Sequence, residues 1–341
     1  MPFKARAWAA ALIAAIGTGA PVTAQETTWQ VSLWGAPRAF TEHVEFLARS
    51  VRLRTGGDFI IEIDYGGLSS NRENLDGIRA GAFEMAQFCA GYHPEKNRAI
   101  TALELPFLGI RTLEEELAAS RALYAHPAVE AEMAEWNARL LMPSPLPQYN
   151  LVGGGVPPEG LDWLDGRSIR ATGGIGRALA LFGAEPVSLT ADETRAAMED
   201  GTLDAVAFAQ HAHFSFDTIS LARWWTTNLD PGSVNCPVVV NEDALAALSE
   251  EHRAVLLDSA DRAMDHYLAN YGDLILKWNE VLEVFGIEQV ALPEAELERL
   301  ASGAADVRAQ WVADRTAEGL PAQELLTTIE DALRDHRTGG F

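Results

Sequence analysis

One uninterrupted helical period constrains the fold of this chain more than any other feature. From Ser249 to about Val284, apolar residues recur at spacings of three and four with no proline among them. At ~1.5 Å per residue, about 36 residues would extend roughly 54 Å, which is longer than one small lobe is wide. Ser249, followed by Glu250 and Glu251, provides an N-terminal cap with acidic residues in the first turn. A fold that holds this helix needs two lobes for it to lie across.

Short apolar segments typical of β-strands alternate with amphipathic helical segments through much of the chain. The helical segment at 40–51 places Phe40, Val44, Leu47 and Val51 at spacings of three and four. The strand-like segments are Trp29 to Trp34, Phe59 to Tyr65, Met85 to Cys89, Ser168 to Ala171, Ala205 to Phe208 and Val238 to Val240. This alternation predicts an α/β fold in which parallel sheets are covered by helices on both faces.

The chain length and one irregular segment predict how the lobes divide. A chain of 341 residues exceeds what one hydrophobic core usually holds. The Pro- and Gly-rich segment from Pro143 to Pro158 separates two alternating regions and is the candidate crossing between lobes. We expect residues 25–147 and about 236–275 to form lobe I, and residues 148–235 and about 276–341 to form lobe II.

The first 24 residues have the layout of a secretory signal peptide. Lys4 and Arg6 precede an apolar run from Ala7 to Ile16, and Val22-Thr23-Ala24 forms a cleavage site. The run is too short for a membrane helix, which needs about 20 apolar residues. A buried N-terminal helix is the alternative, but no polar face interrupts the run. We expect a mature chain that begins near Gln25, is exported to the periplasm and does not insert into a membrane.

Charge, cysteine content and the lack of catalytic motifs exclude several classes of protein. The formal net charge of −23 opposes binding to nucleic acid or to anionic lipid surfaces. Cys89 and Cys236 could pair in an oxidising compartment or could be two unrelated buried thiols, and the sequence leaves both open. No nucleophile elbow and no recognisable cysteine nucleophile is present. We therefore predict a protein that is not an enzyme and needs no cofactor.

The segment from Leu164 to Gly176 carries the strongest indication of a binding site. It indicates a turn, a short strand that ends at Arg170, and a glycine-rich bend that opens a helix near Arg177. In open α/β folds ligands bind at the carboxyl ends of strands, so Arg170 would point into a cleft. Its guanidinium could bind a carboxylate through two parallel hydrogen bonds, and the amides at the helix start would favour the same anion. The alternative is that Arg170 pairs with a structural acid.

The same glycines also invite comparison with a dinucleotide-binding loop. Gly174-Ile175-Gly176 follows a strand and precedes a helix, but Leu179 stands where that fingerprint requires a small residue. A metal pair at His211 and His213 is a second possibility, since alternate residues of a strand share a face. No third ligand of suitable spacing stands nearby, and a zinc site needs three or four ligands. We predict neither a nucleotide site nor a metal site.

Several motifs together resemble the extracytoplasmic solute-binding proteins of TRAP transporters, the DctP-like family. The matching segments are Gly66-Gly67-Leu68, Gly81 to Ala86, Asp165 to Arg170, Phe182 to Val187, Glu193, and Ala196 to Ala205. The resemblance covers essentially the whole mature chain. It implies a two-lobed fold like that of periplasmic binding proteins, with the long helix spanning both lobes. It also implies TRAP membrane permease subunits as partners.

The resemblance further implies roles for individual residues. The family's near-invariant arginine corresponds to Arg170, which would form a salt bridge with the ligand carboxylate in the closed state. Many members carry another basic residue upstream, where this chain has Gln148-Tyr149-Asn150. The keto-acid-binding branch places an aromatic residue near Phe208 and an acidic, metal-holding residue where this chain has Ala207. A bound cation is therefore not implied.

Aromatic residues complete the set of candidate ligand contacts, since their rings could hold an apolar body or a quaternary ammonium. Each ring alone fits a core position as well. The candidate ligand-binding residues are Arg170, Phe208, Asn150, Trp34, Phe88, Trp225 and Asn228. We expect capture of a small organic acid. The alternatives are a zwitterionic, betaine- or ectoine-like compatible solute, a periplasmic sensor subunit that serves a receptor kinase, and an exported hydrolase.

Overall fold

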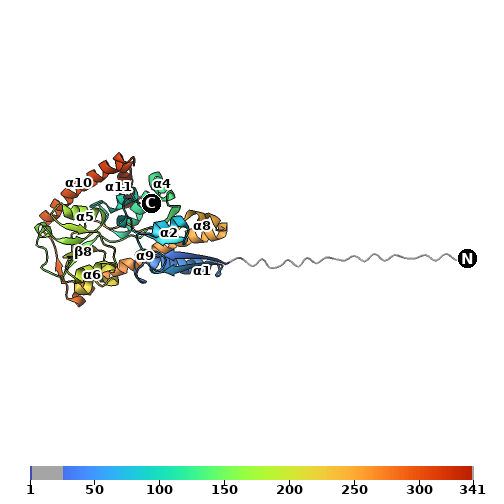
Figure 1. Cartoon of the computed structure of the whole chain (residues 1–341), viewed down its shortest axis with the longest axis horizontal. Helices are drawn as coiled ribbons and strands as arrows, with labels where there is room; N and C mark the ends of the chain where they lie inside the picture. The colour runs from blue at the N-terminus through green and yellow to red at the C-terminus, as the bar shows by residue number, and fades with distance from the viewer. Residues whose placement is uncertain (2–25, 340–341) are drawn as a thin grey trace.

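The computed structural model describes Met1 and residues 26–339. The predicted cleavage site after Ala24 lies outside the described residues, so the signal peptide stays a prediction. Figure 1 shows two halves, one that contains α1, α2 and α8 and one that contains α5, α6 and β8. Each half is built around one sheet. In the part of the chain that the structure describes, no helix has the length and apolar character needed to cross a membrane.

The first sheet has the strand order β2-β1-β3-β10-β4. β1 runs parallel to β2 and β3, whereas β10 runs antiparallel to both of its neighbours. The strands are β1 (Thr27–Ser32), β2 (Phe59–Asp64), β3 (Met85–Gln87), β4 (Ala138–Met142) and β10 (Val238–Asn241). The helices that accompany this sheet are α1 (Glu42–Arg54), α2 (Asn74–Ala80), α3 (Leu113–Tyr124), α4 (Pro127–Ala134) and α8 (Glu242–Ala247). The predicted apolar face of α1 is completely buried at Val44, Leu47 and Val51.

The second sheet has the strand order β11-β9-β5-β8-β6-β7. Its strands are β5 (Asn150–Gly153), β6 (Ser168–Arg170), β7 (Glu185–Val187), β8 (Ala205–Phe208), β9 (Trp224–Thr226) and β11 (Glu288–Val290). Its helices are α5 (Gly173–Ala180), α6 (Thr194–Glu199) and α7 (Gln210–Ser215). β5 is antiparallel to β8 and β9. Both sheets are thus mixed instead of parallel as expected, because β5 and β10 each follow a segment that carries the chain from one sheet directly to the other.

The predicted long helix is α9 (Glu250–Phe285), and the Ser249 side chain caps it by accepting a hydrogen bond from the His252 amide. α9 contacts α1 and β4 on the side of the first sheet and α7 on the side of the second. It therefore spans both lobes. Short 3-10 helices lie at η1 (Ala90–Tyr92), η2 (Ile100–Glu104), η3 (Leu161–Leu164) and η4 (Ile219–Leu221).

The two C-terminal helices connect the lobes a second time. α10 (Glu294–Ala317) contacts α5, and α11 (Ala322–Thr338) packs on α3 and η2. α11 thus lies with the first sheet, whereas we expected all of residues 276–341 in lobe II. The cause is its apolar face, since Leu325, Ile329 and Leu333 are buried in the same core as Leu103.

Candidate functional site

A small cavity lies between the two lobes at the carboxyl ends of strands from both sheets. Its volume is about 30 Å³, which is room for about two water molecules when each needs roughly 10–15 Å³. The lining residues are Trp34, Arg38, Phe40, Cys89, Tyr92, Leu146, Tyr149, Arg170, Ala191, Phe208, His211, Ala212, Phe216, Val234 and Cys236. This set contains two arginines and no aspartate or glutamate, so the cavity presents positive charge on an aromatic and apolar wall.

Arg170 ends β6 and is 2% exposed. Its Nε donates a hydrogen bond to the Leu189 carbonyl (3.1 Å), and one terminal nitrogen donates to the Ala207 carbonyl (3.0 Å). The other terminal nitrogen lies 3.4 Å from the Tyr92 hydroxyl, which comes from the opposite lobe. The guanidinium carbon lies 4.2 Å from the centre of the Phe208 ring. These contacts fix the orientation of the guanidinium and leave its charge without an anion.

No carboxylate of residues 26–339 lies within 4.0 Å of the Arg170 nitrogens. The alternative of a structural acid that pairs with Arg170 therefore finds no support in this arrangement. Glu104 and Glu193 interact with Arg170 only from a longer distance, so the cost of burying the charge is not offset by direct pairing. A carboxylate at this position would supply the missing partner and a charge-assisted hydrogen bond.

Arg38 is a second cation at the cavity and was not predicted from the sequence. It follows β1, and its guanidinium carbon lies 5.3 to 5.8 Å from the ring centres of Trp34, Phe40 and Phe216. One terminal nitrogen donates to the carbonyls of Trp34 (2.6 Å) and Ala36 (2.9 Å). Burial lowers the pKa of Arg38 to about 10, so the group keeps its charge at neutral pH.

Besides the two arginines, Tyr92, Tyr149, His211 and Trp34 supply the polar side-chain atoms of the lining. Tyr149 is 4% exposed, and its hydroxyl has no hydrogen-bond partner among the described residues. His211 bonds through Nδ1 to the Tyr271 hydroxyl and stacks on the Phe40 ring at a centroid distance of 5.0 Å. Burial, helped by the charge of Arg38, lowers the pKa of His211 well below its usual value. The imidazole is therefore neutral and adds no charge to the cavity.

The structure answers the open question about the two cysteines. Cys89 and Cys236 form a disulfide and both line the cavity. Cys89 follows β3, and Cys236 precedes β10 in the segment that returns the chain from the second sheet to the first. The disulfide thus ties this returning segment to the first sheet beside the proposed ligand position.

Three of the predicted ligand contacts lie at the cavity, namely Arg170, Phe208 and Trp34, and the other four do not line it. Phe88 is fully buried in the core of the first lobe, and Trp225 packs against His213 and Trp278. The remaining two are asparagines that organise loops. Asn150 bonds to Thr226 Oγ1, the Leu229 amide and Asp230, and Asn228 bonds to the backbone of Leu292.

The histidine pair was expected on a strand but lies in α7. His211 faces the cavity, whereas His213 is fully buried beside Thr218 and Trp225. Within residues 26–339, no group of three or more His, Cys, Asp and Glu side chains is placed to hold a metal ion.

The glycine-rich bend after Arg170 packs closely against the other lobe. α5 begins at Gly173, earlier than expected, and its first turn lies against η2 of the other lobe. A Cβ at Gly173 would approach Glu104 Oε2 to 2.6 Å, and one at Gly174 would approach the Glu104 carbonyl to 2.3 Å. The carboxyl group that this helix start meets is therefore Glu104 of the chain itself.

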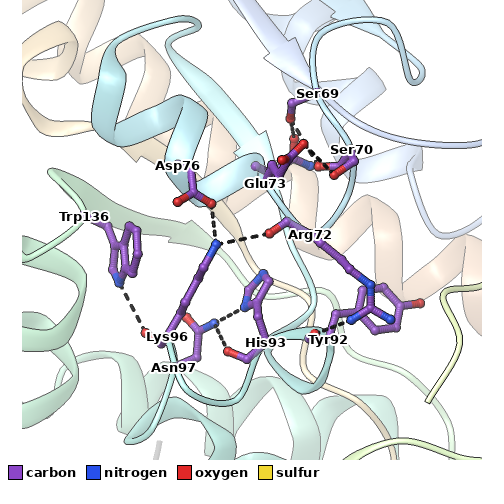
Figure 2. Close-up of polar contacts among 11 residues, drawn as sticks. Ser69, Ser70, Arg72, Glu73, Asp76, Tyr92, His93, Lys96, Asn97 and Trp136 are labelled. Atoms are coloured by element: carbon purple, nitrogen blue, oxygen red, sulfur yellow. Dashed lines mark hydrogen bonds and ion pairs between the residues drawn. The ribbon is translucent and has the colours of Figure 1, made fainter. Parts of the chain in front are cut away.

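Loop contacts hold the lobes together at the edge of the cavity. Asn71 Nδ2 donates to Asp192 Oδ1 (3.2 Å), and Arg72 donates to the Ser188 carbonyl (3.2 Å), in both cases from the first lobe to the second. Figure 2 shows the Arg72 guanidinium beside Tyr92, to whose carbonyl it also donates. Tyr92 in turn contacts Arg170. The edge contacts and the cavity are therefore connected through one tyrosine.

Comparison with known proteins places this architecture in a family. Residues 32–314 match the model of the DctP family, described as bacterial extracellular solute-binding protein, family 7. A curated relative, described as the outer membrane transporter protein TsaT of Comamonas testosteroni, is 25% identical over 334 residues, which cover 96% of this chain and 97% of the relative.

Solved TRAP solute-binding proteins share the fold. One, from an unidentified marine microbe, is specific for aromatic acid ligands and was solved with metahydroxyphenylacetate. Its TM-score is 0.79 at 20% identity, covering 91% of this chain and 99% of that one. A Bordetella pertussis receptor that binds pyroglutamic acid has a TM-score of 0.78 at 18% identity, covering 90% and 99%. A Bordetella bronchiseptica protein with bound mandelate has a TM-score of 0.77 at 21% identity, covering 91% and 99%. This chain therefore belongs to the DctP family of extracellular solute-binding proteins, the receptors of TRAP transporters.

Proposed function

We propose that this protein captures a small organic acid between its lobes in the periplasm and delivers it to the membrane permease subunits of a TRAP transporter. The observation that carries the proposal is Arg170, a guanidinium that is 2% exposed and has no carboxylate partner in residues 26–339. A ligand carboxylate would complete the two-pronged interaction for which a guanidinium is suited. Structural relatives that bind metahydroxyphenylacetate, pyroglutamic acid and mandelate support an acid as ligand.

The lining favours an acid with an apolar, ring-like body, and such a ligand needs the lobes to lie further apart than they do around the cavity of about 30 Å³ in this structure. Phe40, Phe208 and Phe216 provide ring surfaces, and Leu146 and Val234 add aliphatic surface. Neutral hydrogen-bonding side chains are few, so a sugar acid would leave most of its hydroxyls without partners, which costs about 1–3 kcal/mol for each buried polar group.

The charge of the lining disfavours a betaine- or ectoine-like zwitterion. The rings that could attract a quaternary ammonium already lie beside Arg38 or Arg170. A ligand cation at those rings would be repelled by the guanidinium groups. The same geometry would also serve a sensor subunit, and transport is preferred because the family consists of TRAP receptors.

Calorimetry with 3-hydroxybenzoate, mandelate and pyroglutamate tests the proposal, with the matching neutral amides as controls. We expect the acids to bind and the amides to bind at least tenfold more weakly. Arg170→Met should weaken binding of the acids at least roughly tenfold, because a charge-assisted hydrogen bond is commonly worth about 1.5–3 kcal/mol. Arg170→Lys should fall between wild type and Arg170→Met, since lysine keeps the charge without the planar fork.

Arg167→Met is the matched control, because Arg167 precedes the same strand but pairs with Asp204 instead of lining the cavity. Affinity within twofold of wild type in Arg170→Met would show that the carboxylate anchor lies elsewhere. A thermal unfolding curve for each variant separates loss of the ligand contact from loss of the fold.

A further inference from the structure

Arg38 has unused hydrogen-bonding capacity that points to a second ligand contact. One terminal nitrogen serves the carbonyls of Trp34 and Ala36, which accounts for the shape of the loop after β1. The Nε atom is buried and has no hydrogen-bond partner, and the other terminal nitrogen has none among the described residues. Buried donors usually have partners, and this guanidinium lies in the wall of the cavity. The unpartnered Nε therefore indicates an acceptor in the cavity that the protein itself does not supply.

The charges of the cavity indicate what kind of acceptor this is. Arg38 comes from the first lobe and Arg170 from the second, and neither forms an ion pair within 4.0 Å with a carboxylate of residues 26–339. The lining set contains no acid. One carboxylate on Arg170 would leave Arg38 as a desolvated cation without a partner, which is the costly arrangement for a buried charge.

The space between the two guanidinium groups is defined by aromatic rings. Arg170 lies on Phe208, Phe208 lies 6.3 Å from Phe216, and Arg38 lies 5.5 Å from Phe216. Each guanidinium therefore contacts a different ring of the Phe208–Phe216 pair. A ligand that pairs with both cations needs one acidic group for each and an apolar body that fits against the rings.

We propose that Arg38 forms a second anion subsite and that the preferred ligand is an aromatic dicarboxylate, held by Arg170 at one end and by Arg38 at the other. This inference rests on the proposed function, because it takes Arg170 as the anchor of the first carboxylate. It also assigns Arg38 a part in closure, since a dicarboxylate of this kind would join a cation of each lobe.

The test compares dicarboxylates with half-esters that differ only in the second charge. The probes are phthalate, isophthalate and terephthalate, the monomethyl ester of each, and benzoate, all titrated by calorimetry into the full-length mature protein. We expect at least one dicarboxylate to bind at least tenfold more tightly than its monomethyl ester and than benzoate. The three isomers present different angles between the carboxylates, so the preferred isomer reports the relative placement of the two arginines.

Arg38→Gln removes the proposed cationic partner, and the monomethyl ester removes the second carboxylate. Together the two changes form a double-mutant cycle for this pair. We expect Arg38→Gln to lower affinity for the preferred dicarboxylate at least tenfold and affinity for the ester less than threefold, with Arg38→Lys in between. Arg49→Gln is the control, because Arg49 is exposed on α1 and pairs with Glu42 at the surface. If Arg38→Gln fails to fold, the ratio of dicarboxylate to ester affinity in wild type decides the question.

The other outcomes separate the two proposals. Equal affinity of wild type for dicarboxylates, esters and benzoate would overturn the second subsite and leave Arg170 as the anchor of a monocarboxylate. An equal loss of benzoate and dicarboxylate binding in Arg38→Gln would also overturn it, because both arginines would then share one carboxylate. A wild-type protein that binds none of these acids, nor 3-hydroxybenzoate or mandelate, would overturn the proposed function and this inference with it.

Discussion

The boundary between the lobes contains two regions that bury ionisable side chains, basic in one and acidic in the other. In the ligand cavity, Arg38 and Arg170 lie without an acid among the lining residues. At the contact between η2, α3 and the returning segment, Glu104 and Glu116 are buried without an ion-pair partner among residues 26–339. Glu104 Oε1 accepts hydrogen bonds from the amides of Gly91 and Asn235, and Glu116 accepts one from the Ser233 hydroxyl.

The difference between the regions lies in what each side chain can do with its charge. Burial raises the pKa of Glu104 to about 7 and that of Glu116 to about 8, so protonation can remove the charge near neutral pH. Arginine cannot lose its proton under these conditions. A buried acid can therefore be part of a stable contact by itself, whereas a buried arginine without an acid is poised for an anion from outside. This contrast makes the cavity, and not the Glu104 contact, the candidate site for an external anion.

The largest effect is expected from the disulfide that lies between these regions. Cys236 is next to Asn235, which bonds to Glu104, and the disulfide itself lines the cavity. It closes a loop with a sequence separation of 147, for which the chain-entropy treatment gives a stabilisation of up to about 5 kcal/mol. The double substitution Cys89→Ala, Cys236→Ala should lower the free energy of unfolding by roughly this amount, as measured by urea denaturation.

Reduction of wild type with dithiothreitol is the matched comparison, because it breaks the bond and keeps the side chains. Serine in place of alanine controls for the lost side-chain volume. A midpoint unchanged by reduction would mean that the returning segment is held by packing alone. The cavity and the Glu104 contact would then be coupled by other contacts.

The second effect concerns the pH dependence of stability at Glu104. Because burial raises its pKa from the ordinary value of 4.5 to about 7, the folded state keeps a proton that the unfolded state has lost between these values. The contribution of Glu104 to the free energy of unfolding is therefore greatest below pH 4.5 and decreases as the pH rises to 7. A span of about 2.5 pKa units corresponds to about 3 kcal/mol. Glu104→Gln should remove this loss, so the variant gains on wild type as the pH rises.

Chemical denaturation at intervals from pH 4 to pH 8 measures this difference. Glu116→Gln should behave alike and over a range that extends to about pH 8. Glu115 is the opposite control on the same helix, because its hydrogen bond with Arg337 lowers its pKa, and its contribution is lost as the pH falls. If the Glu104→Gln difference stays constant with pH, this carboxyl is ionised in the fold, and the contrast with the arginines fails.

The sequence predicted the architecture better than it predicted the site. The helix ending near Val284 and the strands at 59–65 and 205–208 were recovered, because their apolar patterns are long or regular. The antiparallel direction of β5 and β10 was not predicted, because the direction of a strand depends on how the chain crosses between the sheets. Arg170 was identified because it ends a recognisable strand within a family motif.

Two site predictions were displaced by one residue for the same physical reason. Phe88 was predicted, but it is the next residue, Cys89, that lines the cavity, and in the same way Tyr149 lines it instead of Asn150. Successive side chains along an extended chain point to opposite sides, and the sequence does not show which side faces the other lobe. Arg38 follows the strand-like segment that ends at Trp34, so the strand-end argument that was applied to Arg170 could have included it. Its lack of an acid partner became visible only with the fold.

The smallest effect should come from the edge contacts, which join the lobes without touching the cavity charges. Arg72→Gln removes the hydrogen bond to the Ser188 carbonyl and the guanidinium beside Tyr92, and Asn71→Ala removes the hydrogen bond to Asp192. Hydrogen bonds of this kind are worth about 0.5–1.5 kcal/mol, and these two are partly exposed, so each substitution should weaken ligand binding only about threefold.

The kinetics of binding show whether these contacts act on closure. Because they form only when the lobes meet, their loss should raise the dissociation rate in stopped-flow measurements and leave the association rate unchanged. Lys96→Gln is the matched control, since Lys96 bonds to Asp76 and the Arg72 carbonyl within the first lobe (Figure 2). Asn71→Ala carries the decisive information, because Asn71 does not contact Tyr92, the residue that connects Arg72 with Arg170. If both variants dissociate faster, the edge contacts hold the lobes closed. If only Arg72→Gln dissociates faster, Arg72 acts on the cavity through Tyr92.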